Sequence, residues 1–147
     1  MTVAHTRALL EGLAGLLADA GLGVYRSNPG EVYGDDETAL GFGAMPDSPD
    51  RVIWLNTYPV EDTDQPDTIT GVQVRIRVGP DPLEAGDVAD AVFAQLHNRQ
   101  ALTFGSLRVG LIWRQSQAPL GQDANGREEL TANYYARSTR PAPYLND

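Results

Sequence analysis

The spacing of apolar residues changes within one continuous segment, Thr70–Asn98. Every second residue from Val72 to Val78 is apolar, which predicts a strand with one apolar face and one polar face. After a break at Gly79–Pro82, apolar residues recur every three or four positions from Ala85 to Leu96. This spacing predicts a helix of about four turns with a single apolar stripe. The segment is therefore a strand, a turn and a helix that can pack on one another.

The same patterns predict a leucine-rich helix and several further strands. The helix covers Val3–Ala20 and ends at Gly21, and a short strand follows at Val24–Tyr25. The other predicted strands are Thr38–Met45, Arg51–Tyr58, Leu107–Gln115 and Arg127–Arg140. In Leu107–Gln115 the alternation places Leu111 and Trp113 on the apolar side and Ile112 on the opposite, polar side. Ala118–Gly126 contains Asn125–Gly126, which suits a turn between the last two strands and makes them an antiparallel hairpin. We expect Pro59–Asp67 to be an exposed loop and Ala101–Gly105 a short apolar link.

These elements give one core, in which we expect the following residues to be buried: Leu13, Leu17, Val74, Ile76, Val92, Phe93 and Leu96. The length of 147 residues favours a single domain over residues 1–147, with an irregular tail at 141–147.

Composition excludes several function classes. The chain has no cysteine, which removes disulfides and thiolate catalysis and leaves no common structural zinc site. No apolar run approaches the roughly 20 residues that cross a bilayer, and no secretory signal is evident, so we expect no membrane partner. The net charge of −9 argues against electrostatic binding of nucleic acid, which depends on clustered basic residues.

Two acidic clusters are candidate sites. One contains Glu61, Asp62, Asp64 and Asp67, and the other contains Asp35, Asp36 and Glu37. Their carboxylates could hold a hard cation, but the ligand spacing of a calcium loop is missing, so solvated loops are favoured over metal sites. His5 and His97 lie outside any triad-like or metal-binding pattern. No nucleophile, base and orienting group can be assembled, so we expect no enzyme activity and no cofactor.

Five arginines lie on the polar faces of strands that should be neighbours: Arg75, Arg77, Arg108, Arg114 and Arg137. One interpretation is a solvent-exposed sheet face, on which cross-strand pairs contribute at most about 1 kcal/mol each. The other is an interface, because Arg beside Tyr135 and Trp113 is typical of binding hot spots. Residue types alone leave both interpretations open.

The order of these elements resembles the small tail-terminator, or minor capsid, proteins of long-tailed bacteriophages. The resemblance covers roughly Val3 to Pro141. In that family a strand of alternating Val and Arg leads through an Asp-Pro turn into a helix that ends in Leu-His or Leu-Gly, and the last strand reads Arg-x-x-x-x-x-Asn-Tyr/Phe. The matching positions here are Val74–Val78, Asp81–Pro82, Leu96–His97 and Arg127 with Asn133–Tyr134.

The resemblance implies an α+β fold with a mixed, mostly antiparallel sheet flanked by two helices. It also implies a homo-hexameric ring that caps the head-proximal end of the tail tube, ends tube polymerisation and joins the tail to the neck. The expected partners are further copies of the chain, the tail tube protein and a neck or head-completion protein, in the virion and, during assembly, in the host cytoplasm. DNA would pass through the lumen without specific binding, because acidic walls oppose the counterion release that holds DNA on basic surfaces.

In such a ring we expect subunit contacts at Arg75, Arg77, Arg114, Tyr135 and Arg137, and we expect lumen-facing acids among Asp35, Asp36, Glu37, Glu61, Asp62, Asp64 and Asp67. Two alternatives stay open. The chain could be a head-side neck or head-completion protein, or a bacterial α+β module that binds a small ligand between its helices and sheet.

Overall fold

The computed structural model describes residues 4–28 and 30–146, which form two helices and a seven-stranded sheet. The elements in chain order are α1 (His5–Asp19), β1 (Val24–Tyr25), β2 (Ala39–Phe42), β3 (Val52–Asp62), β4 (Asp67–Arg77), α2 (Pro82–Leu96), β5 (Arg99–Phe104), β6 (Leu107–Gln122) and β7 (Glu128–Thr139). The strand order is β1-β2-β3-β4-β7-β6-β5. The first two pairs are parallel and the others are antiparallel, which confirms the predicted α+β class with a mixed, mostly antiparallel sheet.

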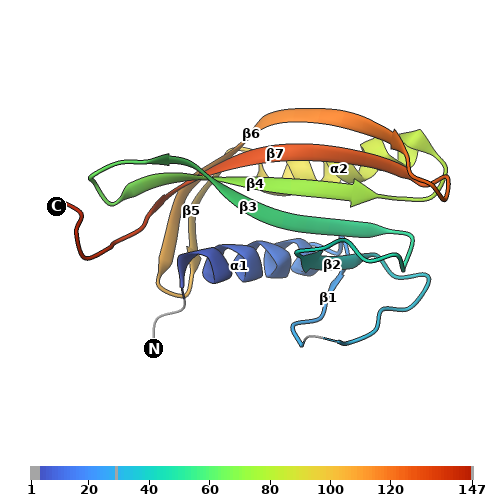
Figure 1. Cartoon of the computed structure of the whole chain (residues 1–147), viewed down its shortest axis with the longest axis horizontal. Helices are drawn as coiled ribbons and strands as arrows, with labels where there is room; N and C mark the ends of the chain where they lie inside the picture. Colours follow the sequence, from blue (N-terminus) through green and yellow to red (C-terminus); the bar gives the residue numbers. More distant parts are fainter. Residues whose placement is uncertain (1–3, 29, 147) are drawn as a thin grey trace.

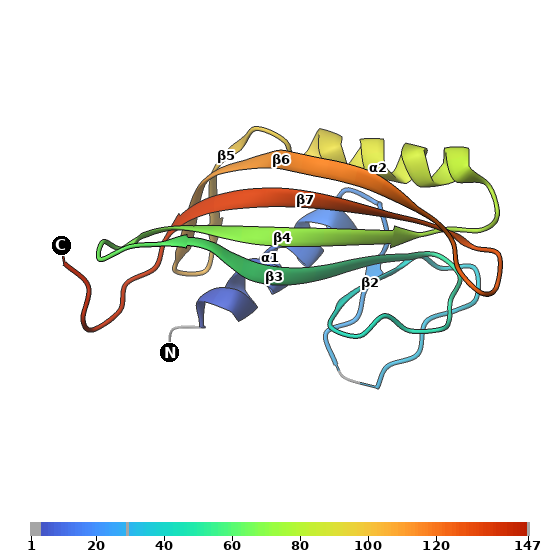
Figure 2. The ribbon, with the colours of Figure 1, turned by 45° about the horizontal axis from the view of Figure 1, so that its top comes forward.

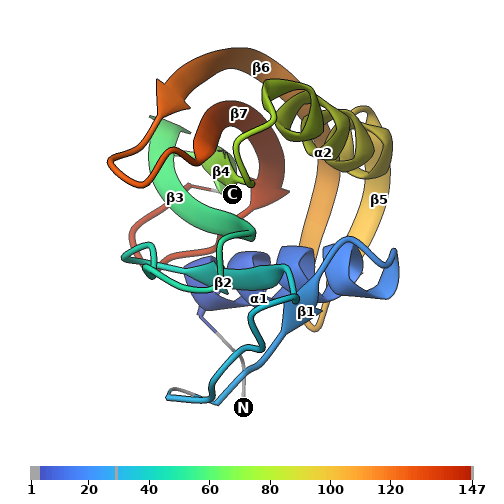
Figure 3. The same cartoon turned by 90° about the vertical axis from the view of Figure 1, so that its right-hand side faces the viewer.

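Four long strands, β3, β4, β7 and β6, run side by side along the longest axis of the molecule (Figures 1 and 2). The sheet curls strongly, with α1 lying near β2 and α2 beside β6 and β7 (Figure 3). Apolar residues of both helices belong to one buried cluster with alternate residues of these strands. Both helices therefore cover the same face of the long sheet, and no helix within residues 4–28 and 30–146 lies on its other face.

Six of the seven residues predicted for the core are buried; they are Leu13, Leu17, Val74, Ile76, Val92 and Leu96. The prediction for Phe93 is wrong, because its side chain is only half-buried at the surface of α2. It stacks on His97 with ring centroids 4.5 Å apart, and the Arg114 guanidinium lies 4.3 Å from its ring centroid. Phe93 lies at the border of the apolar stripe of α2, next to the core, and Arg114 covers the face of its ring that points away from the core.

The helix boundaries follow local chemistry. Asp81 precedes α2 and its carboxylate accepts a hydrogen bond from the Leu83 N–H at 2.9 Å, while Pro82 occupies the first helical position. Gly21 follows α1 with a φ of +83°, a conformation that favours glycine. Of the predicted first helix, Val3 lies outside the described residues.

Both hairpins are longer than predicted. Pro59 to Asp62 continue β3, so the expected Pro59–Asp67 loop shrinks to a tip at residues 63–66. Ala118 to Gln122 likewise continue β6 instead of forming a loop. The expected link at Ala101–Gly105 is also wrong, because it lies mostly in β5, which pairs with the start of β6. Backbone pairing extends these strands through residues whose sequence has the polar, Pro-containing character of loops.

A β-bulge reverses one predicted side-chain alternation. The pairing of β6 with β7 skips Gly110 between Val109 and Leu111. Each skipped residue moves the following side chains to the opposite face. Ile112 is therefore buried, and Leu111 and Trp113 are only half-buried, the reverse of what strict alternation predicts.

Candidate interaction surfaces

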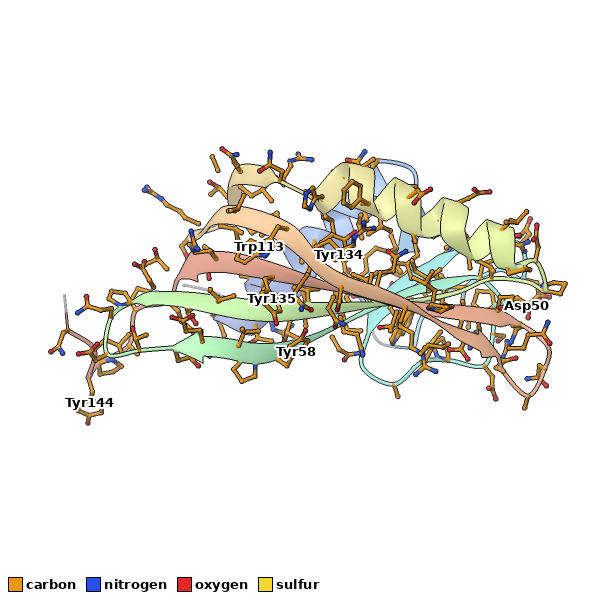
Figure 4. The ribbon with its side chains drawn as sticks, turned by 90° about the horizontal axis from the view of Figure 1, so that it is seen from above. Asp50, Tyr58, Trp113, Tyr134, Tyr135 and Tyr144 are labelled. Carbon is orange, nitrogen blue, oxygen red and sulfur yellow. The ribbon has the colours of Figure 1, made fainter. Side chains whose placement is uncertain are left out.

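The helix-free face of β3, β4, β7 and β6 is the largest continuous candidate surface, and we call it the open face (Figure 4). One row across it contains Tyr58, Gly71, Tyr135 and Trp113, which are register partners on successive strands. The Tyr58 ring lies directly over Gly71, where an added Cβ would come within 2.2 Å of it. The Trp113 and Tyr135 rings meet edge to face at 5.8 Å.

Amide and hydroxyl groups continue this surface. The Tyr58 hydroxyl donates to Asn133 Oδ1 at 3.1 Å, and Asn133 Nδ2 donates to Ser116 Oγ at 3.1 Å, so one chain of hydrogen bonds spans the four strands. Partial burial raises the pKa of Tyr58 above its ordinary value, with the Tyr135 phenol as a smaller cause. Sequence reasoning did not single out Tyr58 or Asn133 as surface residues of interest. The alternation of β3 and β7 was a signal that could have found them.

The five predicted contact residues have different environments. Arg75 lies on the open face, where its guanidinium forms a 2.7 Å ion pair with Glu129 on the adjacent strand. Arg77 is only 4% exposed, and it donates to the backbone oxygens of Asp50 at 2.9 Å and Pro49 at 2.7 Å. Burial, followed by repulsion from Arg127, lowers the pKa of Arg77. The expectation of an accessible polar face is therefore wrong at Arg77, which holds the β2–β3 connection against β4.

The other three predicted residues lie on β6 and β7. Tyr135 packs edge-on against Trp113, and the guanidinium of the exposed Arg137 lies 5.6 Å from the Trp113 ring centroid. Arg114 covers Phe93 and donates from Nη1 to Gln117 at 3.2 Å. Tyr135, Trp113 and Arg137 thus form one cluster on the open face, whereas Arg114 reaches α2.

Two residues of the last-strand pattern have internal roles. Arg127 is 7% exposed, with its Nε 2.8 Å from Asp123 and its Nη1 3.3 Å from Asp50, so it joins the β6–β7 turn to the β2–β3 connection. Tyr134 lies fully inside the core, and burial raises its pKa to about 12. These two residues stabilise the subunit, and of the three residues that define the pattern only Asn133 reaches the open face.

The two acidic clusters lie at opposite ends of the longest axis (Figure 1). Glu61, Asp62, Asp64 and Asp67 surround the β3–β4 tip, and Asp35, Asp36 and Glu37 lie in the β1–β2 connection. Glu37 pairs with Arg26 at 3.1 Å, and this hydrogen bond, followed by one from the Gly34 N–H, lowers the Glu37 pKa. The two acidic clusters are therefore too far apart within one subunit to bind the same ligand.

Two stretches of strand have a backbone edge that no other strand in the described part of the chain covers, and we call them the half-edges. The β2 strand pairs only with Val52–Leu55, which leaves Thr57–Asp62 of β3 uncovered. The β5 strand pairs with β6 only as far as Ile112, and Gln115–Gln122 are exposed throughout. The half-edges lie on opposite sides of the four-stranded sheet and toward its opposite ends.

The described residues contain no group of three His, Asp or Glu side chains placed to hold a metal ion. No helix in residues 4–28 or 30–146 is long and apolar enough to cross a membrane. The prominent features are a flat face of aromatic and amide groups and two half-edges. Such surfaces are typical of proteins that act by making contacts with other proteins.

The model of one family, the bacteriophage tail terminator proteins, matches residues 16–140. The chain therefore belongs to the bacteriophage tail terminator family, and it is a structural protein of the phage tail. The fold is also similar to a chain in the virion of a native gene transfer agent particle, with a TM-score of 0.58 and 14% identity over 92% of this chain and 95% of that one. At this identity the likeness shows the fold alone. No curated protein sequence matches the chain.

Proposed function

We propose that copies of this protein form a closed homo-hexameric ring at the head-proximal end of the tail tube, assembled in the host cytoplasm. The ring ends tube polymerisation and joins the tail to the neck. One side of the ring copies the contacts of a tube ring, and the other side presents a different surface to a neck or head-completion protein. The family supports this position in the tail, and the half-edges support a closed assembly of copies.

The β6 half-edge is the observation that carries self-association. Gln115–Gln122 are all exposed and none is charged, in a chain of which 21% of residues are charged. Monomeric proteins usually protect such an edge with charges, proline, β-bulges, a short strand or a covering segment, because unpaired N–H and C=O groups are a template for a further strand. This half-edge contains Pro119 and register shifts at Arg114/Ser116 and Pro119/Gly121, but it carries no charge and no strand of the described residues covers it. Leu120 on this half-edge, with Tyr58 and Val60 on the other, is among the exposed large apolar side chains.

The directions of the strands permit antiparallel pairing between different half-edges. Along the sheet β3 is antiparallel to β4, β4 to β7 and β7 to β6, so β6 of one copy meets β3 of a similarly oriented neighbour in antiparallel fashion. Contacts between two different surfaces close into a ring when the rotation between copies permits. Each copy would then supply four strands to one continuous sheet.

The stagger of the half-edges suits a closed sheet. The centres of the two stretches are offset by about six residues along the strands, or roughly 20 Å, and four strands span about 19 Å across the sheet. Because these two lengths are nearly equal, neighbouring copies stay at the same height along the ring axis only if the strands are tilted by roughly 45° to that axis. Closed barrels have tilts near this value, typically about 35–45°. The same stagger in untilted strands would give an open helix.

We keep three of the predicted residues in the proposed subunit contact. Arg114 directly precedes the β6 half-edge, and Tyr135 and Arg137 lie on the next strand beside Trp113 and Leu111, just before the half-edge begins. Arg75 lies one strand from β3 but beside Trp54, where β2 covers the edge, and it is already paired with Glu129. Arg77 is left out, because its guanidinium is occupied inside the subunit.

The acidic ends suit a passage for DNA. In a ring of tilted strands the β3–β4 tip and the β1–β2 connection lie toward opposite openings, so their carboxylates would repel the DNA backbone at both mouths. Repulsion opposes the counterion release through which basic surfaces hold DNA. DNA could then slide through without being held.

Single-cysteine variants test the joint, because the chain has no cysteine of its own. Val60→Cys marks the β3 half-edge and Ala118→Cys marks the β6 half-edge, and Ala91→Cys on the exposed side of α2 is the matched control. We expect a short bismaleimide to link subunits when Val60→Cys and Ala118→Cys are mixed, and not when Ala91→Cys replaces either. Native mass spectrometry should show six copies.

Cross-linking of Ala118→Cys alone would indicate a two-fold β6–β6 dimer and would contradict the ring. Tail length tests the role in the phage. Without the protein, tubes should extend beyond their normal length, and unchanged tail length in its absence would contradict the proposed termination.

A further inference from the structure

A side-chain hydrogen bond fixes where the β6 half-edge begins. The last pair of β5 with β6 joins Arg99 and Ile112. The next pair in this register would join His97 and Arg114. The chain has left the strand at that point, and the Arg114 N–H donates to the ring atom Nδ1 of His97 at 3.0 Å. A strand of another copy therefore finds its first free position at Gln115.

The β3 half-edge is bounded in the same way. The last pair of β2 with β3 joins Phe42 and Leu55, so Gly43 and Asn56 would come next. The Asn56 side chain accepts from the Gly43 N–H and donates to the Gly43 carbonyl, both at 3.2 Å. These bonds occupy the backbone groups through which β2 would continue along β3. The free edge of β3 therefore begins at Thr57.

These limits leave few registers for the joint between two copies. Six residues of β3, Thr57–Asp62, pair in antiparallel fashion within eight residues of β6, Gln115–Gln122, of the next copy. Three registers allow all six to pair, and they place Asp62 opposite residue 115, 116 or 117. In each of them Asp62 lies on the strand beside Arg114, at most three residues along, or roughly 10 Å.

Asp62 lies on the face of the sheet that carries the helices. Its carboxylate accepts a hydrogen bond from the hydroxyl of Thr68, its register partner on β4. Thr68 in turn pairs with Ser138, whose hydroxyl contacts His5 of α1 at 2.9 Å. Glu61, the preceding residue, lies on the opposite face. The ion pairs among the described residues do not include Asp62.

Arg114 lies on the same face as Asp62. Its guanidinium lies over the Phe93 ring of α2, 4.3 Å from the centroid, and its Nη1 donates to the Gln117 side chain at 3.2 Å. The guanidinium thus extends along the first residues of the β6 half-edge, the stretch that Asp62 of the neighbour faces in all three registers. No carboxylate in residues 4–28 and 30–146 forms an ion pair with Arg114.

We propose that Asp62 of one copy forms an ion pair with Arg114 of the next copy, on the helix-bearing side of each joint. The proposal rests on the self-association proposed above. Complementary charges across an interface fix its register and disfavour wrong pairings. The contact uses one of the four carboxylates at the β3–β4 tip, so the others stay available to the DNA passage.

Charge reversal tests the pair, because a joint between unlike surfaces lets two variants complement each other. Asp62→Arg has arginine at both positions and Arg114→Asp has aspartate at both, so either variant alone brings like charges together at every joint. We expect each to raise the concentration at which half of the chains are assembled at least about tenfold. An equimolar mixture should assemble like the parent chain. Native mass spectrometry should show that its rings contain equal numbers of the two variants, because only alternating copies place opposite charges at every joint.

Two control variants make the same charge changes outside the half-edges. Asp19→Arg on α1 and Arg108→Asp on β6 alter exposed positions and should assemble like the parent chain. Far-ultraviolet circular dichroism of the diluted subunits shows whether each variant is folded. If Asp62→Arg does not fold, Asp62→Asn keeps an acceptor for Thr68 and should still raise the concentration of half-assembly, by about threefold.

Assembly of either reversed variant at the parent concentration, or a mixture that assembles no better than its components, would overturn the pair. The ring would survive that result if the parent chain still forms it and Val60→Cys still cross-links to Ala118→Cys. A parent chain that forms no ring would refute the ring and this contact together.

Discussion

Two glycines that lie beneath aromatic rings should respond differently to the same substitution. A Cβ added at Gly41 would lie 2.4 to 2.9 Å from three atoms of the Trp54 ring, and a Cβ at Gly71 would lie 2.2 to 2.7 Å from three atoms of the Tyr58 ring. Distances this short require the ring to move. Trp54 is 9% exposed and packs with Ala39, Val52, Tyr33 and Met45, although it also borders a cavity of about 460 Å³. Tyr58 is 37% exposed, so its ring can move into solvent with less loss of packing.

The expected magnitudes follow from this difference. Gly41→Ala displaces a buried, packed ring, and overpacking of this kind typically costs about 1–3 kcal/mol of the free energy of unfolding. Gly71→Ala lets Tyr58 swing outward at the cost of its hydrogen bond to Asn133, about 1 kcal/mol. Alanine also restricts the unfolded chain, which returns about 0.4–1 kcal/mol at both positions. We therefore expect Gly41→Ala to be clearly destabilising and Gly71→Ala to be close to neutral.

Urea denaturation followed by far-ultraviolet circular dichroism, below the concentration of self-association, measures both effects. Gly110→Ala is the matched control, because the nearest atom to its added Cβ is the Arg137 carbonyl oxygen at 3.9 Å, an ordinary contact. We expect this variant to match or exceed the stability of the parent chain. If Gly71→Ala were as costly as Gly41→Ala, or Gly41→Ala as mild as Gly110→Ala, the assignment of a rigid Trp54 and a mobile Tyr58 would be wrong.

Three further variants test the core, a titrating group and a buried charge. Leu13→Ala removes a side chain that is 1% exposed, and it should lower the free energy of unfolding by on the order of 2–5 kcal/mol in chemical denaturation. Leu83 is 76% exposed, so Leu83→Ala should lower it hardly at all. Equal effects of the two variants would contradict the packing of α1 in the core. Burial, with the charge of Arg140 as a smaller cause, lowers the pKa of His5 below its ordinary 6.5. As the pH falls below 6.5 the unfolded chain therefore binds the proton first, so stability should decrease until the folded protein is protonated too. His5→Gln should flatten that decrease in the pH dependence of the melting temperature, and a decrease that persists in this variant would refute the assignment. Arg77→Met removes the guanidinium and leaves the carbonyls of the β2–β3 connection without their hydrogen-bond donors. This variant should lower the free energy of unfolding by on the order of 3 kcal/mol, measured by calorimetry. A loss below about 1 kcal/mol would contradict the role given to Arg77.

Much of the fold could be predicted because it rests on local periodicity. The alternation from Val72 to Val78 and the stripe from Ala85 to Leu96 became β4 and α2, because each apolar face had only one place to be buried. Asp81 and Pro82 fixed the start of α2 through their own backbone chemistry. The arginine-bearing strands were expected to be neighbours, and β4, β7 and β6 are adjacent.

The candidate surfaces were harder to predict, because they depend on what each side chain meets across the sheet. Arg75 and Arg77 look equivalent on the polar face of one strand. The β2–β3 connection covers Arg77, whereas Glu129 pairs with Arg75 on the open face. Only contacts between residues far apart in the chain distinguish the two arginines.

The sequence by itself determined the two helices, because periodicity and capping are properties of neighbouring residues. The sheet class came from the family resemblance. Tertiary structure decided where strands end and which face each side chain takes. A skipped residue at Gly110 moved Ile112 into the core, and pairing with β4 and β7 drew Pro59–Asp62 and Ala118–Gln122 into strands. It also left Thr57–Asp62 and Gln115–Gln122 uncovered, because β2 and β5 are short. Backbone hydrogen bonding between distant segments set these features, and no local pattern records it.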